Sequence, residues 1–273
     1  MAMELVTQLP YDHPYRWDGS LFGGPRLWRP NTLGSSLALW LDAEDSASVI
    51  LNGSTVSQWS DKSGNGRNAI QGTAANQPTY LLSAINGKPA LSFATSNMLF
   101  NTSMPIDDPF SFFAVASSTG TTAGQYYCMM RINYTDPVNL TAHGFIGSYA
   151  GDFSTFFGNG ITWNDVNPNT PLTSVATTKL LSVVNAGATA TPFVNGVAQN
   201  TKVGTMAAAI GYFLGTNAAL AQAWTGQMAE IVIISSAVSE SNRQILEGYL
   251  AWKWGLVSNL PSTHPFKLLP PTV

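Results

Sequence analysis

Residues 239–271 read SESNRQILEGYLAWKWGLVSNLPSTHPFKLLPP, and this is the stretch with a sustained helical period. Apolar residues recur there at i, i+4, i+7 and i+11. These are Ile245, Tyr249, Trp252 and Leu256. Ser239 is placed to cap the first turn and Gly255 to end the last. The pattern predicts a helix over 240–254 with one buried face.

The stripe assigns the two neighbouring tryptophans different environments. Trp252 lies on the apolar stripe, so we expect its ring to be buried and to contribute more to stability than that of Trp254. Trp254 falls on the opposite side of the helix, where only the proline-rich tail HPFKLLPP is available to cover it.

The rest of the chain alternates apolar and polar residues in short runs bounded by Gly, Asn, Pro and Ser, which is typical of strands. The predicted strands are 37–41, 55–59, 90–93, 110–117, 126–132, 144–149, 154–157, 179–185, 191–194, 211–215 and 227–234. Val194-Asn195-Gly196-Val197 predicts a type I′ hairpin within a meander over 179–203. We therefore expect an all-β sandwich sealed by one helix, with residues 36–273 forming one domain.

Composition excludes some partners. Charged residues make up 10% of the 273 residues and the formal net charge is −3, which argues against nucleic acid and anionic membrane as partners. The uncharged stretch 203–229 is interrupted by Asn217 and Gln222, so we interpret it as strand and turn rather than as a membrane span. Cys128 has no second cysteine to pair with and is expected to be a small buried apolar residue.

Residues 1–35 differ from the remainder of the chain, because they combine scattered prolines with large aromatics and show no sustained period. The aromatic residues proposed to anchor this arm are Tyr11, Tyr15, Trp17, Phe22 and Trp28. Free in water they would be poorly solvated, so the arm is predicted to dock on a partner, with packing on its own domain as the alternative. The first residues lack the pattern of a secretory signal peptide.

Four blocks of sequence suggest a relationship to known domains. They are LALWLDAEDSASV (37–49), VSQWSDKSGNGRNAIQ (56–71), QPTYLLSAINGKPALSF (77–93) and WTGQMAEIVIISSAVSESNRQILEGYLAWKWGL (224–256). Together they resemble the concanavalin A-like, laminin-G-like jelly rolls of bacterial surface proteins and phage virion proteins. The resemblance implies a concanavalin A-like jelly-roll fold. It leaves function open, because this superfamily includes lectins, adhesins, accessory modules of hydrolases and purely structural domains.

The loop Asp61-Lys62-Ser63-Gly64-Asn65-Gly66 has two interpretations. Asp61 and Asn65 offer oxygen ligands to Ca²⁺, and the acidic group Asp42, Glu44 and Asp45 would complete such a site if the two loops met. The alternative is a tight turn in which Asp and Asn side chains bond the loop's own backbone. The spacing is not that of an EF-hand, and the turn interpretation is favoured.

No catalytic set is evident in the sequence. Jelly-roll glycosidases need two carboxylates that flank the scissile bond, and the chain has no E-x-D-x-E run to supply them. Glu230 is expected to be a strand-edge or salt-bridged carboxylate. The three histidines, His13, His143 and His264, are far apart in sequence and match no metal motif. The prediction is a protein without enzymatic activity.

Sugar binding requires only an aromatic face and a few hydrogen-bonding groups. Aromatics and amides are both frequent between residues 126 and 169. The candidate carbohydrate-binding residues there are Tyr149, Trp163, Asn164 and Asp165. Trp163 leads this group, because turn-forming residues surround it.

Two classes of function are consistent with these features. The first is a phage virion structural protein at the virion surface, a capsid decoration or fibre component whose arm holds it to other virion proteins such as the major capsid protein. Such a protein would form a homo-oligomer, of which a trimer is one form, and would present a lectin-like jelly roll to host-surface glycans. The alternative is a carbohydrate-binding lectin or adhesin module of a tail fibre or bacterial surface protein.

Overall fold

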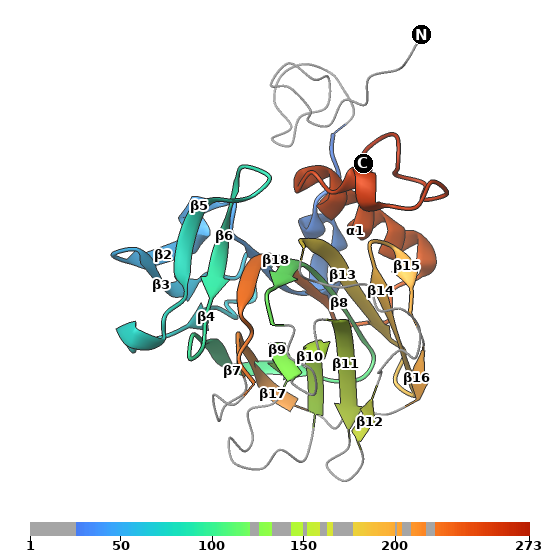
Figure 1. Cartoon of the computed structure of the whole chain (residues 1–273). Coiled ribbons are helices and arrows are strands. Elements are labelled where there is room, and N and C mark those ends of the chain that lie inside the picture. Colours follow the sequence, from blue (N-terminus) through green and yellow to red (C-terminus); the bar gives the residue numbers. More distant parts are fainter. Residues whose placement is uncertain are drawn as a thin grey trace.

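The computed structural model describes residues 26–120, 126–132, 143–149, 152–158, 163–165, 177–199, 201–203, 209–216 and 222–273. Within these ranges the chain is nearly all β, with eighteen strands, one α-helix and short 3-10 turns (Figure 1). Every predicted strand is present with small shifts of its ends, which confirms the all-β class. The strands form one continuous antiparallel sheet that folds over into two layers, as in a jelly roll.

The back layer is built around β18 (Gly226–Ile234). One side of β18 pairs with β8, and the other pairs with β1 and, further along, with β6. The sheet continues from β8 to β13 and then to β14, β15 and β16. The bounds are β1 Leu37–Asp42, β6 Lys88–Phe93, β8 Phe110–Ser118, β13 Lys179–Asn185, β14 Thr189–Val194, β15 Val197–Ala198 and β16 Lys202–Val203.

The front layer runs in the order β4, β7, β17, β9, β10, β11 and β12. A small group of strands, β2, β3 and β5, joins it to β6 of the back layer. The bounds are β2 Val49–Asn52, β3 Thr55–Trp59, β4 Ala69–Ile70, β5 Thr79–Ile85, β7 Leu99–Ile106, β9 Tyr126–Ile132, β10 His143–Tyr149, β11 Asp152–Gly158, β12 Trp163–Asp165 and β17 Ala209–Leu214.

Strand alternation gives the back sheet two buried faces. Phe112 and Ile231 point into the apolar core between the layers. Phe113 and Val232, one position along each strand, point to the other side and pack under the helix α1 (Glu240–Lys253). Because both faces are covered, the centre of β8, residues 112–116, is a continuous apolar run rather than an alternating one.

Local signals at two turns are confirmed. Asn195 and Gly196 both have positive φ, 51° and 79°, and join β14 to β15 as the Asn-Gly pair predicts. The Ser239 side chain accepts a hydrogen bond from Asn242 N and caps α1 as expected.

The predicted stripe is confirmed at Tyr249 and Leu256, which are buried in the cluster that Ile245 packs against, but the environments predicted for the two tryptophans were wrong. Trp254 is fully buried, whereas Trp252 is only partly buried. Leu246, Leu250 and Trp254 pack beside Tyr249 against the sheet, so the buried face is wider than the predicted stripe and includes Trp254 in place of Trp252. The error has a physical cause: the C-terminal tail covers the Trp252 side, so the helix has two apolar sides and no single stripe defines it.

The tail is held against α1 by specific contacts. The Trp252 indole donates a hydrogen bond to the Phe266 carbonyl at 2.8 Å. Phe266 lies so close to Gly248 that a Cβ at that position would fall 2.6 Å from the Phe266 Cβ. The helix is therefore packed between the back sheet and residues 261–273.

The start of the described chain belongs to the domain. Leu27 forms an antiparallel bridge with Thr272, and Trp28 N donates to Pro271 O at 3.0 Å. Trp28 is 8% exposed and meets the ring of Tyr249 edge to face. Its predicted role in anchoring to a partner is therefore corrected, since this indole packs on its own helix. The other four arm aromatics, at 11, 15, 17 and 22, lie outside the described residues.

Candidate functional site

The most concentrated polar site in the described part of the chain lies between α1 and the back sheet. Asp42, the last residue of β1, is directly opposite Glu230 of β18. Both face the helix, because Leu41 and Ile231 occupy the alternate positions that face the sandwich core. Two carboxylates on adjacent strand positions repel each other unless a cation separates them.

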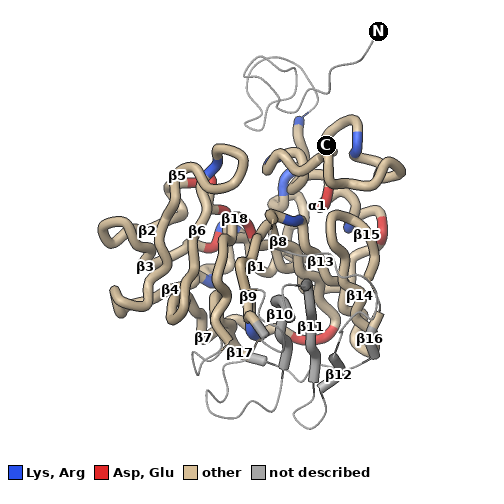
Figure 2. Tube along the Cα trace, in the orientation of Figure 1, with Lys and Arg blue, Asp and Glu red and all other residues tan. Residues whose placement is uncertain are grey.

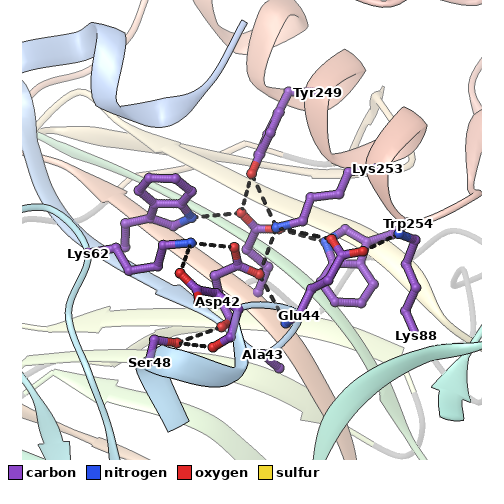
Figure 3. Close-up of polar contacts among 12 residues, drawn as sticks. Asp42, Ala43, Glu44, Ser48, Lys62, Lys88, Tyr249, Lys253 and Trp254 are labelled. Carbon is purple, nitrogen blue, oxygen red and sulfur yellow. Dashed lines mark hydrogen bonds and ion pairs between the residues drawn. The ribbon is translucent and has the colours of Figure 1, made fainter. Parts of the chain in front are cut away.

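Glu230 is fully buried and bound by four donors, of which Tyr249, Lys253 and Trp254 are labelled in Figure 3. Trp40 Nε1 and Tyr249 OH each donate to Oε1 at 2.7 Å. Trp254 Nε1 donates to Oε2 at 2.6 Å, and Lys253 Nζ lies 2.7 Å from the same oxygen. Two of these donors, Tyr249 and Lys253, come from α1, Trp254 is the C-cap residue that ends it, and Trp40 comes from β1, so the carboxylate fixes the helix to the sheet.

Two lysines neutralise the acidic pair. Lys253 Nζ lies 2.7 Å from Asp42 Oδ1 as well as from Glu230, and Lys62 Nζ lies 2.8 Å from both Asp42 Oδ2 and Asp45 Oδ2. The Lys62 ammonium also sits 4.3 Å from the centroid of the Trp40 ring. Lys88 pairs with Glu44 at the outer edge. Figure 2 shows that many of the charged residues gather at this end, near β5, β18 and α1.

The protein environment shifts the pKa values of these groups in different directions. Burial alone would raise the pKa of Asp42, but Lys253 and Lys62 outweigh it and hold that pKa below its ordinary value. Burial raises the pKa of Glu230, against the influence of Lys253. Burial alone would lower the pKa of Lys253, but Glu230 and Asp42 outweigh it, so the net shift of that pKa is upward.

A cleft of about 240 Å³ opens beside this network, lined by Arg29, Trp40, Asp42, Glu44, Asp45, Lys62, Tyr249 and Lys253. Its carboxylates are engaged by protein cations, and Glu230 lies beneath it with no exposed surface. A glycosidase needs two carboxylates that reach the substrate. This acidic pair instead fixes α1 to the back sheet through ion pairs and hydrogen bonds, in agreement with the predicted salt-bridged role of Glu230.

A second buried carboxylate ties the tail to the helix. Glu247 accepts a hydrogen bond from Ser182 of β13 at 2.9 Å and pairs with Arg243 one turn earlier on α1. His264 Nε2 lies 3.4 Å from Glu247, while His264 Nδ1 accepts a hydrogen bond from Phe266 N. The sequence predicted a salt bridge for Glu230 but not its partners, and it did not predict the Glu247 network; the available signal was the set of charged residues in α1 that lie among its apolar ones.

The geometry of the 61–68 loop favours the turn interpretation over the calcium site. The Asp61 carboxylate accepts hydrogen bonds from the backbone N of Trp40, Ser63 and Arg67 and from the Ser63 hydroxyl. The Asn65 amide donates to the carbonyl oxygen of Leu37 at 2.9 Å. These side chains bind the loop to β1. In the residues that the structure describes, no group of three His, Cys, Asp or Glu is arranged to hold a metal ion.

The same loop forms one wall of a groove of about 280 Å³. The opposite wall is the end of β7 and the β7–β8 turn, and the floor includes Phe110 and Ile233. Its polar side chains include Asn65, Arg67, Asp107 and Ser35. This groove was not predicted, because it joins segments that are far apart in sequence.

The predicted sugar-binding residues do not share one location. Trp163, Asn164 and Asp165 form β12, where Trp163 pairs with Gly158 of β11. Gly158 pairs in turn with His143, at the start of β10, whereas Tyr149 ends that strand. Six residues of strand correspond to about 20 Å, so Tyr149 and Trp163 lie at opposite ends of the front sheet. The side chains of all four residues lie outside the described part.

Cys128 behaves as the sequence predicts. The residue is fully buried, and burial raises the pKa of its thiol to about 12, as expected of an unreactive apolar residue. In the described segments, no helix is both long and apolar enough to cross a membrane.

No protein-family model matches the sequence, and no curated protein is significantly similar to it. Solved structures share its fold. Domain 4 of an extracellular GH43 arabinanase from Geobacillus stearothermophilus, in complex with arabinotriose, is 15% identical with a TM-score of 0.53; the match covers 76% of this chain and 95% of that domain. An arabinofuranosidase complexed with arabinofuranosyl-α-1,2-xylobiose is 14% identical with a TM-score of 0.56, covering 73% of this chain and 51% of that one.

The binding domain of botulinum neurotoxin serotype D is a third similar structure, 12% identical with a TM-score of 0.55. The match covers 81% of this chain and 55% of the toxin chain, so this protein spans about half of that structure. At such identities the likeness establishes the fold alone. The chain therefore has a β-sandwich fold of the kind found in these carbohydrate-complexed and binding domains, as the concanavalin A-like expectation requires.

Proposed function

We propose that this protein is a non-enzymatic carbohydrate-binding module displayed on a larger assembly. The observation that supports binding rather than catalysis is the state of the paired carboxylates. Asp42 and Glu230 are brought together by the fold but are neutralised by Lys253 and covered by α1. They hold the helix in place: Glu230 has no exposed surface, and Asp42, which lines the cleft, is engaged by Lys62 and Lys253.

The fold supports the same proposal. The arabinanase domain with a similar structure was solved with arabinotriose, and the match covers 95% of it. A jelly roll of this size can bind sugars through shallow surfaces or grooves, which need no catalytic set. We extend this role to the present chain as a proposal about its function, because fold alone does not determine function.

A glycan array with the full chain tests the proposal. We expect binding to one or more oligosaccharides and no release of reducing sugar from any of them. Trp163→Ala and Tyr149→Ala report on the two ends of the front sheet, and each serves as the control for the other. An array with no bound glycan would refute the proposal, whereas sugar release would show an enzyme.

The arrangement of the termini favours a second, compatible role as a phage virion structural component at the virion surface. The segment at Arg26–Arg29 pairs with the C-terminal residues Pro271–Val273 beside α1 (Figure 1). The first 25 residues therefore join the domain at its helix end. β11 and β12 lie at the other end of the molecule. A protein attached through this arm would present the β11–β12 end outward.

Removing residues 1–25 tests this role, because the truncation keeps Trp28 and the Leu27–Thr272 bridge in place. We expect the full chain to bind at regular sites on phage capsids that lack this protein, through the major capsid protein. The truncated chain is expected not to bind these capsids. Light scattering measures whether the full chain forms the proposed homo-oligomer, such as a trimer. Equal decoration by both forms would show that the arm is not the anchor.

A further inference from the structure

The groove beside the 61–68 loop contains charged groups that bind no oppositely charged residue in the described ranges. It lies where β1 begins and β7 ends, and its volume of about 280 Å³ is near the lower end of the range for small-ligand sites. Most charged side chains near α1 are engaged by each other. Three charged residues line this groove: Arg67, Asp107 and Asp108. Asp108 accepts a hydrogen bond from Asn185, whereas neither Arg67 nor Asp107 has an ion-pair partner in the described part of the chain.

Arg67 is held in position before any ligand arrives. Its Nη1 donates to the Ala38 carbonyl at 2.8 Å, and its backbone N donates to Asp61 at 3.0 Å. Its own carbonyl accepts a hydrogen bond from the buried Tyr212 hydroxyl at 2.8 Å. The remaining guanidinium nitrogens have no partner among the described residues. A fixed guanidinium with free N–H groups matches the planar geometry of a carboxylate.

The groove also supplies two oxygen acceptors, Asp107 on the β7–β8 turn and Asn65 on the same loop as Arg67. Asp107 is exposed on the β7–β8 turn and has no hydrogen-bond donor in the described ranges. Asn65 uses its amide nitrogen to bind β1, which leaves its side-chain oxygen without a described donor. Met104 and Ile106 of β7, both buried, are among the other lining residues. Hydroxyl groups are ligand groups that can donate to such acceptors.

We propose that this groove binds an acidic sugar, with the sugar carboxylate on Arg67 and its hydroxyls on Asp107 and Asn65. The inference rests on the proposed carbohydrate-binding function and adds to it a location and a ligand class. Arg67 selects the acid, because a neutral sugar leaves its guanidinium without a counter-ion. Asp107 disfavours a second anionic group at the rim, so singly charged sugars are preferred over sulfated or multiply charged ones.

The test measures calorimetric affinity of the full chain for glucuronic acid, galacturonic acid and N-acetylneuraminic acid, each against its methyl ester and against arabinotriose. We expect the free acids to bind at least about tenfold more tightly than their esters, as expected for a charge-assisted pair. Arg67→Gln removes the positive charge and is expected to abolish that preference, whereas Arg67→Lys keeps the charge without the planar guanidinium and is expected to retain only part of it. Arg26→Gln, at an exposed arginine outside the groove, is the matched control.

Asp107→Asn is the second variant, because it changes an exposed side chain with no described partner and leaves the loop intact. It is expected to weaken binding of the free acid about threefold through lost hydroxyl contacts. Acid binding that survives both Arg67 variants, or that falls equally in Arg26→Gln, would overturn the groove as its site. Binding of arabinotriose but of no acid would overturn the acidic-sugar inference and leave the proposed function standing; binding of no glycan would refute both.

Discussion

Two charged regions of this molecule are arranged in opposite ways. Around Glu230 the acids and bases are buried and bind one another, with Lys253 placed 2.7 Å from both Asp42 and Glu230. In the groove beside Asn65, the Arg67 guanidinium and the Asp107 carboxylate remain without described ion-pair partners. The difference separates charge used for structure from charge available to a ligand, and burial rather than residue type distinguishes the two.

The largest expected effect in this comparison comes from Glu230→Ala. The change leaves Lys253 without one of its two close counter-ions and three buried donors without an acceptor. We expect a loss of about 5 kcal/mol in the free energy of unfolding, measured by urea denaturation. Glu240→Ala, at an exposed helix position, is the control and should cost little. Equal losses of stability in the two variants would mean that Glu230 does not fix the helix to the sheet.

The next largest effect on stability is expected for the two tryptophans at the end of α1, Trp252 and the C-cap residue Trp254. Trp254→Ala empties a fully buried site and removes a donor to Glu230, so we expect a loss of about 4 kcal/mol. Trp252→Ala removes a partly buried ring and one hydrogen bond to the tail, and about half that loss is expected. Thermal unfolding of both variants measures the two losses of stability and therefore their ratio. A larger loss at Trp252 would favour the stripe predicted from the sequence and contradict the helix orientation.

The ion pairs of Asp42 also predict that the free energy of unfolding depends on pH. The folded-state pKa of Asp42 lies below its ordinary value of 3.8, so its stabilising contribution is present above pH 3.8. It is lost as the pH falls through the depressed pKa. We expect the difference in unfolding free energy between the native chain and Asp42→Asn to shrink below pH 3.8. A difference that stays constant down to acid unfolding would show that Asp42 is not stabilised by Lys253 and Lys62.

The smallest effect on stability is expected for a substitution in the groove. Asp107→Asn changes an exposed side chain with no described partner, so the midpoint of urea unfolding should not move. Circular dichroism during denaturation measures this. A clear loss of stability would mean that Asp107 has a structural role, and the contrast between the two charged regions would fail.

The fold could be predicted from the sequence where the signals are local. Strand alternation, the Asn195-Gly196 turn and the Ser239 cap each depend on neighbouring residues, and all three are confirmed. The environments of the two tryptophans could not be predicted, because the tail that covers Trp252 folds back from residues 261–273. A hydrophobic stripe identifies the buried face only when the other face meets water.

The site was harder to predict for a related reason. Asp42 and Glu230 are far apart in sequence, and only the register of β1 against β18 places them opposite each other. The acidic residues in and near the 61–68 loop allowed a calcium site as one interpretation. In the structure, Lys62 forms ion pairs with Asp42 and Asp45, and backbone N–H groups donate hydrogen bonds to the Asp61 carboxylate. The groove joins residues of β7 to the 61–68 loop, which no local pattern relates. Sequence patterns report residue chemistry well and long-range pairing poorly.

The position of β18 between β1 and β8 has a consequence for synthesis. Trp40 and Glu230 are 190 residues apart, so β1 leaves the ribosome long before its partner strand exists. During that interval β1 and β8 present open backbone edges and apolar side chains, which favours pairing with other nascent chains. We therefore expect slow folding governed by the last sixth of the chain, and aggregation of any fragment that ends before β18.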